Sequence, residues 1–333
     1  MRAKNRPLIA HFALLVAAFG QLQPASASAA VSAEAIAADP LQAADRKLAS
    51  VTLPLLRQNA RLCRIFAPAT GLVLHSRDQY TNPTFERFHG DSVLAIAAVA
   101  PGSPAEAAGL RTGMSVLSIG DTGPEQWRDA NVTPLRDAAY ASLFAQSRDS
   151  LLVVSDGAAA RTVQLRAPLG CRALVEVTTE SGLAARADGR VIQVSYGLVS
   201  GATEAELAVI VAHELAHQIL EHRRRLDLAG VRKGFFGQFG GNLAANRMAE
   251  EEADRLSVHL LANAGFDPDI APRFWRTGMG VSLGSGLFRN RAYRSPDDRA
   301  AFLDREIDRY LGNGAGPTYP GHLLIRRDGP IIY

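Results

Sequence analysis

The sequence predicts an α+β fold, in which a mainly helical domain carries a small inserted β-rich domain. Residues 71–168 contain short apolar runs separated by Gly, Pro and Asp, which is typical of strands joined by turns. Residues 41–62 carry apolar side chains at helical spacing, and helical patterns dominate the chain after residue 199. We therefore expect four segments, at residues 1–29, 30–69, 70–168 and 169–333.

The first segment has the composition of a secretory signal peptide. Three basic residues among the first six precede an apolar run from Pro7 to Gly20, and small residues follow. The run is short for a bilayer span, so we expect cleavage after Ala27 or Ala29; an uncleaved membrane anchor is the alternative. No later stretch reaches the roughly 18 consecutive apolar residues that a spanning helix needs. We expect a mature chain without a transmembrane segment, secreted across the inner membrane into the periplasm, either free or peripheral to a membrane.

The composition excludes several classes of protein. Of the 333 residues, 47% are apolar and 21% are charged, which excludes a disordered chain and leaves enough apolar side chains for a sizeable core. The 36 Lys and Arg residues exceed the 33 Asp and Glu residues by three, and three of the basic residues lie in the signal peptide. The mature chain is therefore close to neutral, and we expect no nucleic-acid partner.

Within the β-rich segment, one stretch predicts a short helix, a turn and a strand. Ser103 and Pro104 are typical of a helix start, and Gly109 and Gly113 bracket a turn before an apolar strand at 115–119. This pattern resembles the bacterial PDZ signature, and the resemblance covers roughly residues 70–168.

A PDZ-like domain would bind an extended peptide by strand addition. The resemblance places the groove between a strand at Val93–Val99 and a helix at Leu135–Phe144. Asp91, just before that strand, would repel a terminal carboxylate, so capture of a free C-terminus is not expected. The alternative is a small β domain that only shields or positions the other domain.

The helical domain contains a motif that predicts a metal-binding site. Thr203 and Glu206 are spaced as a capping box, which predicts the start of an apolar helix from Leu207 to Leu220. His213 and His217 lie four residues apart within that helix, so both imidazoles face one side and can bind one metal ion.

Glu214, next to the first histidine, can hold and deprotonate a water at such a metal ion. A catalytic zinc site needs a third protein ligand, and the sequence offers carboxylates at residues 250–254 on a later helix. Glu250 and Asp254 share one face of that helix, where the small Ala253 and Ser257 permit close approach to the first helix.

These two segments resemble the HtpX/BepA-type zinc peptidases, a family that includes the CAAX prenyl endopeptidases, from about Ser181 to Arg299. The resemblance implies a zincin-type peptidase domain of the gluzincin kind, with one Zn²⁺ per chain. It implies the zinc ligands His213, His217 and Glu250, the general base Glu214, and Asp254 as the partner that orients a histidine. It also implies polypeptide substrates, such as unfolded or misassembled envelope proteins.

The family also has a histidine six residues before an arginine. Arg299 occupies the arginine position, whereas Tyr293 stands where the family has histidine. Either side chain would then stabilise the developing oxyanion, and His322 is the alternative. Two other functions stay open, namely a zinc-stabilised, non-catalytic PDZ adaptor and a chaperone-like quality-control factor.

The two cysteines predict one disulfide. Cys63 and Cys171 bracket the β-rich segment almost end to end, and the termini of an inserted domain usually lie close together. In an oxidising compartment we expect them to form a bond that fixes the inserted domain, with residues 41–62 packing on the helical core. Two buried free thiols are the alternative.

Overall fold

The computed structural model describes residues 38–80, 92–130, 134–187, 191–231, 240–284, 294–312 and 317–331. It contains both helices and sheets, so the predicted α+β class is confirmed. The predicted signal peptide, Asp91 and Tyr293 lie outside the described residues. Within the described ranges, no helix is both long and apolar enough to cross a membrane.

The β-rich segment forms one five-stranded antiparallel sheet in the order β2-β3-β4-β5-β6. Ser103 caps the first short helix by accepting a hydrogen bond from the Glu106 amide, and Pro104 occupies the first helical turn. The sheet and its helices share one apolar core that includes the buried Trp127. The elements are β2 (Leu72–Ser76), η2 (Arg77–Gln79), β3 (Leu94–Val99), α3 (Pro104–Ala107), β4 (Ser115–Ile119), α4 (Pro124–Asp129), α5 (Leu135–Ala145), β5 (Asp149–Ser155) and β6 (Ala160–Arg166).

The predicted peptide groove beside residues 93–99 is wrong. Strand β3 is central in the sheet, with β2 paired along it and β4 paired at Ala95, so it is not an edge strand to which a peptide could be added. The strand at the edge near α5 is β2. There the Tyr140 hydroxyl accepts a hydrogen bond from the Leu74 amide at 2.9 Å and donates to the Leu72 carbonyl at 3.2 Å. This side chain occupies backbone groups that an added strand would need.

The chain enters and leaves the five-stranded sheet at one place. Strands β1 (Phe66–Pro68) and β7 (Leu169–Cys171) pair antiparallel on the two sides of the β-rich segment. A disulfide joins Cys63 to Cys171, with the two Cα atoms 5.5 Å apart. The bond therefore closes the base of this segment, in the pairing that the sequence predicts.

A second, three-stranded sheet precedes the helices of the C-terminal half. Its order is β8-β10-β9, so β10 is central, parallel to β8 and antiparallel to β9. The remaining elements, in chain order, are β8 (Leu174–Thr178), β9 (Ala185–Ala187), β10 (Val191–Ser195), α6 (Tyr196–Gly201), α7 (Glu204–Ile219), α8 (His222–Leu228), α9 (Gly240–Asn263), α10 (Ile270–Arg276), α11 (Gly278–Gly284), α12 (Pro296–Tyr310), α13 (Gly321–Leu324) and η4 (Ile325–Asp328).

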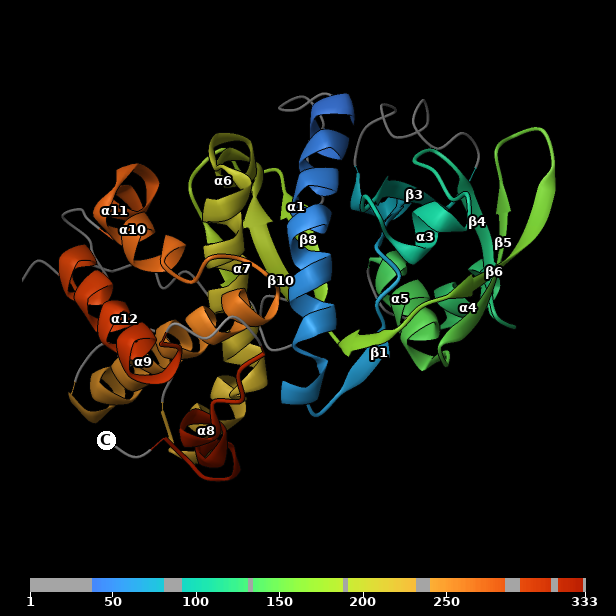
Figure 1. Ribbon diagram of the computed structural model, residues 1–333. Helices are drawn as coiled ribbons and strands as arrows, with labels where there is room; N and C mark the ends of the chain where they lie inside the picture. Colours follow the sequence, from blue (N-terminus) through green and yellow to red (C-terminus); the bar gives the residue numbers. More distant parts are fainter. Residues whose placement is uncertain are drawn as a thin grey trace, which may run out of the picture.

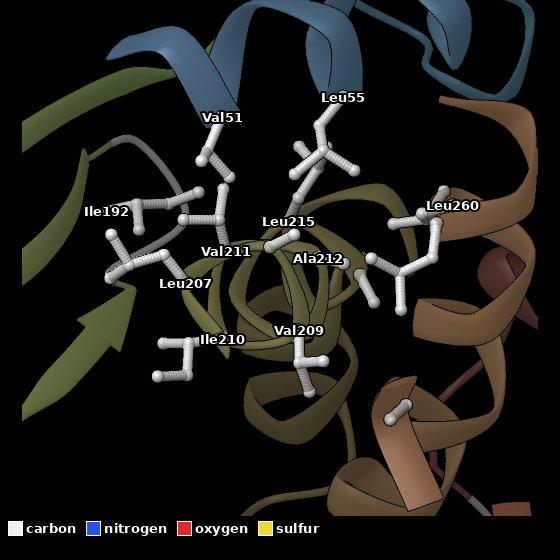
Figure 2. Packing of buried hydrophobic residues seen from close by; sticks show 14 of the residues in the cluster. Val51, Leu55, Ile192, Leu207, Val209, Ile210, Val211, Ala212, Leu215 and Leu260 are labelled. Carbon is white, nitrogen blue, oxygen red and sulfur yellow. The ribbon is translucent and has the colours of Figure 1, made fainter. Parts of the chain in front are cut away.

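Helix α7 lies at the centre of the larger core. Its capping box forms as predicted, because the Thr203 hydroxyl accepts from the Glu206 amide and the Glu206 carboxylate accepts from the Thr203 amide. Side chains around the helix point toward α1, β10 and α9 (Figure 2). Because α7 is packed on several sides, its backbone is held in place. The positions from which its remaining side chains extend are therefore fixed.

Helix α1 (Ala38–Gln58) stands between the two halves of the molecule (Figure 1). One side contributes Leu48, Val51 and Leu55 to the core around α7. Another side packs Leu53 and Ala49 against small residues of the β-rich segment. The short helix η1 (Ala60–Leu62) follows and leads to the disulfide. The N-terminal helix therefore packs on the helical core, as the sequence predicts, and it also contacts the β-rich segment.

Candidate metal centre

Two helices bring together three side chains that could hold a metal ion. His213 and His217 come from α7, and Glu250 comes from α9. The His213 and His217 Nε2 atoms are 3.1 Å apart, and Glu250 Oε2 lies 3.2 Å from the first and 3.6 Å from the second. Ala253, which is fully buried, allows the two helices to approach closely, as the sequence predicts.

The spacing of these three atoms fits a zinc ion. Tetrahedral zinc with bonds near 2.0–2.1 Å places its ligand atoms about 3.3–3.4 Å from one another. The three observed separations bracket that value. Two imidazole nitrogens and a carboxylate oxygen are also a usual donor set for catalytic zinc. The residues present therefore fit one zinc ion with a fourth position left for water.

A chain of charged groups orients His213. Its Nδ1 atom lies 2.9 Å from Asp254 Oδ1, and Arg299 Nε donates to Asp254 Oδ2 at 2.8 Å. The Arg299 guanidinium also stacks over the Trp275 ring at 3.5 Å, and only 4% of Arg299 is exposed. Arg299 is thus directed at Asp254. The expectation that Arg299 stabilises a developing oxyanion stays a prediction. Asp254 contacts a histidine ligand, as the resemblance implies.

The electrostatics of this centre favour a cation. Burial lowers the pKa of His213, but the contacts with Asp254 and Glu250 outweigh burial and raise that pKa to about 10. Burial also raises the pKa of Asp254, yet Arg299 and His213 leave it below its usual range. A site that favours a proton on a buried imidazole also favours a metal ion, because either positive charge offsets the same carboxylates.

Glu214 follows His213 on α7 and is mostly buried. Burial raises the pKa of its carboxyl group, and the neighbouring histidines only partly counter that effect. A carboxylate with a raised pKa beside a metal centre is suited to accept a proton from water. Tyr293, the other predicted catalytic residue, lies outside the described residues.

A second chain of contacts, which the sequence motifs do not predict, orients His217. His217 Nδ1 lies 2.9 Å from His222 Nδ1, and His222 Nε2 lies 3.2 Å from Glu252 Oε2. Arg225 and Arg326 both pair with Glu252, which is 2% exposed. A neutral His222 can accept from His217 and donate to Glu252, which leaves His217 Nε2 free to bind metal.

The turn after α7 positions this second chain. Glu221 has a φ of +53°, the one left-handed non-glycine residue among the described parts of the chain. That conformation separates α7 from α8 and accompanies the contact between His222 and His217. The only signal in the sequence is that His222 follows His217 by five residues. In an uninterrupted helix, residues five positions apart lie on different faces, so this spacing does not predict a contact.

The three adjacent glutamates have three different environments. Glu250 faces the histidines, whereas Glu251 pairs with Arg294 at 2.7 Å. Glu252 is buried against His222 and Arg225. His322, the alternative substitute for the family histidine, contacts Glu306 in another part of the fold.

A cleft of about 640 Å³ opens beside His217. Its walls include Leu215 and Leu228, the Cys63–Cys171 disulfide and Arg172. On another side of α7, the edge strand β9 packs against the helix. His217 thus lines a cleft, and the helix that carries both histidines packs against an edge strand.

Comparisons with known proteins point to metallopeptidases. The chain is 33% identical to the mitochondrial metalloendopeptidase OMA1 of Schizosaccharomyces pombe over 22% of this chain and 27% of that protein. It is 28% identical to a putative β-barrel assembly-enhancing protease of Vibrio cholerae, over 22% of this chain and 21% of that protein. The chain thus spans about a quarter of the length of these relatives. No protein-family model and no solved structure matches it.

Proposed function

We propose that this protein is a zinc-dependent endopeptidase of the gluzincin kind. The observation that carries the proposal is the convergence of His213, His217 and Glu250 with zinc-ligand spacing, directly beside Glu214. The partial similarity to two metallopeptidases supports the same reaction class. A zinc ion held there would polarise the scissile carbonyl and make a water molecule acidic enough to lose a proton near neutral pH.

The chain's own residues perform the proton transfers. Glu214 accepts the proton of the attacking water and later donates it to the leaving amine. Asp254 with Arg299, and His222 with Glu252, hold the two imidazole ligands in fixed orientations. Because these groups are preorganised by packing, little reorganisation is needed as charge develops.

The substrate is an extended polypeptide. Strand β9 is at the edge of its sheet and packs against α7, so a substrate can pair with it along its backbone. The cleft beside His217 then accepts side chains on one side of the scissile bond. Backbone pairing favours unfolded chains, because a folded protein does not offer an extended segment.

We place this activity in the periplasm, on unfolded or misassembled envelope proteins. The signal-peptide pattern and the Cys63–Cys171 disulfide support an oxidising compartment. One of the similar proteins is named as a β-barrel assembly-enhancing protease, which supports an envelope role. The occupied edge of β2 argues against a function as a PDZ adaptor alone.

Cleavage of unfolded casein by the mature chain tests the proposal. Glu214→Gln should bind zinc like the wild type but lose at least about 100-fold in rate, because proton transfer is lost while the ligands remain. A chelator should abolish the wild-type activity. The matched control is Glu204→Gln, at an exposed position on the same helix, which should cleave normally. Wild-type activity in Glu214→Gln would remove this residue from the mechanism.

A further inference from the structure

A second cluster of histidine and glutamate lies away from the candidate metal centre. His259 comes from α9, Glu306 from α12 and His322 from α13. Glu306 Oε1 lies 3.1 Å from His259 Nε2 and 2.8 Å from His322 Nε2. His259 and Glu306 are almost fully buried, whereas about 25% of the His322 side chain is exposed. Helix packing thus brings together residues that are far apart in sequence.

The donor set is the same as in the first centre, namely two imidazole Nε2 atoms and one carboxylate oxygen. Its two measured separations, 3.1 Å and 2.8 Å, compare with 3.1–3.6 Å in the first centre. Each separation would have to lengthen by a few tenths of an ångström to reach the roughly 3.3–3.4 Å that tetrahedral zinc requires, and the three donor atoms all lie within 4.8 Å of one another.

The outer atoms of these side chains are already held by other groups. His259 Nδ1 lies 2.6 Å from the Thr318 hydroxyl, and Arg255 Nε donates to Glu306 Oε2 at 2.6 Å. The stacked Tyr310 ring supports His322. These contacts leave the two Nε2 atoms and Oε1 directed at one another, which is how outer partners orient the ligands of a metal ion.

We propose that His259, Glu306 and His322 bind a second zinc ion, with water as its fourth ligand on the exposed side of His322. Imidazole and carboxylate ligands at this spacing suit zinc among the common divalent ions. The proposal does not depend on the peptidase function proposed above, because the site includes no residue of the first centre.

An ion at this site would fasten the C-terminal segment to the helical core. His322 precedes Arg326, which pairs with Glu252 at 3.2 Å, and Glu252 orients His222 beside His217. The second ion would therefore stabilise the segment that supports one ligand of the first centre. The competing explanation is a hydrogen-bonded cluster in which both imidazoles donate to Glu306 without a metal.

Counting zinc in matched histidine-to-glutamine variants separates the two explanations. His322→Gln keeps a side chain that can donate a hydrogen bond to Glu306 but is a poor zinc ligand, so only metal binding is removed. After saturation with zinc and desalting, mass spectrometry of the folded full chain should find two ions in the wild type. His217→Gln and His322→Gln should each hold one, and the double variant should hold none.

The melting temperature gives a second readout. Added zinc should raise the melting temperature of His217→Gln through the remaining site, and should not raise that of the double variant. If His322→Gln retains the zinc content of the wild type, the second site does not exist. A His322-dependent ion without a His217-dependent one would support this site while contradicting the proposed peptidase centre.

Discussion

Two buried clusters of charged residues in this protein differ in how their members face one another. At the metal centre, His213, His217 and Glu250 direct donor atoms at one point. At the junction between α1, β2, α5 and β8, the buried groups are paired instead: Arg136 with Glu176 and Asp137, and His75 with Asp45 at 3.2 Å. Burial of charge alone therefore does not identify a reactive site. The metal centre differs because its donor atoms converge on one point, where a cation would offset the charge of Glu250.

The junction joins three parts of the chain. Asp45 lies on α1, His75 and Arg136 belong to the β-rich segment, and Glu176 lies on β8 of the other half. Burial raises the pKa of Asp45 well above its usual range, even though Arg136 lowers it. We interpret this cluster as a structural joint between the two halves of the molecule.

The largest expected effect is loss of metal from the convergent cluster. Glu250→Gln should weaken zinc binding by more than about 100-fold and abolish peptidase activity, since it removes a charged ligand. Glu251→Gln is the matched control and should keep both, because that side chain pairs with Arg294. Zinc affinity measured by competition with a chelating dye checks both variants. Loss of zinc in Glu251→Gln instead would show that the assigned helix face is wrong.

The disulfide at the base of the β-rich segment should contribute strongly to the stability of the protein. Its removal should leave metal binding unchanged. The bond closes a loop of 108 residues. In the chain-entropy model, replacing Cys63 and Cys171 by alanine should lower the free energy of unfolding by about 4–5 kcal/mol. Urea unfolding of the double variant and the wild type measures the difference. Equal stabilities of the two proteins would contradict this prediction.

A substitution in the paired cluster at the junction should lower the stability of the protein and leave its metal binding unchanged. Arg136→Met leaves Glu176 buried without its main partner, so the free energy of unfolding should fall by about 3–5 kcal/mol. The control is Arg128→Met at an exposed position, which should change it by less than about 0.5 kcal/mol. Zinc stoichiometry should stay unchanged in both. A loss of zinc in Arg136→Met would show that the two clusters are coupled.

The smallest expected effects come from the residues that orient the ligands. Asp254→Asn and His222→Gln should each weaken zinc binding by about 10–100-fold, with full occupancy restored at high zinc. The loss should be greater for Asp254→Asn, because it removes a charge in contact with His213. The same dye competition measures both. An unchanged affinity in His222→Gln would show that the contact with His217 has no part in metal binding.

The local features of this protein follow from the sequence by itself. The capping box at Thr203, the shared face of His213 and His217, and the turn-separated strands of the β-rich segment each depend on residues within a few positions of one another. The Cys63–Cys171 pairing needs no knowledge of packing, because the chain has only two cysteines and they bracket one segment.

Only the tertiary structure decided which distant residues meet. The strand order places β3 in the centre of the sheet, where the predicted groove cannot form. The packing of the helices places Arg299 in contact with Asp254. The left-handed conformation of Glu221 accompanies the contact between His222 and His217, and the packing of α9, α12 and α13 assembled His259, Glu306 and His322. Periodicity shows which face of one helix a residue occupies, but the partner of that face depends on how whole elements pack, and residues tens of positions apart carry no shared local signal.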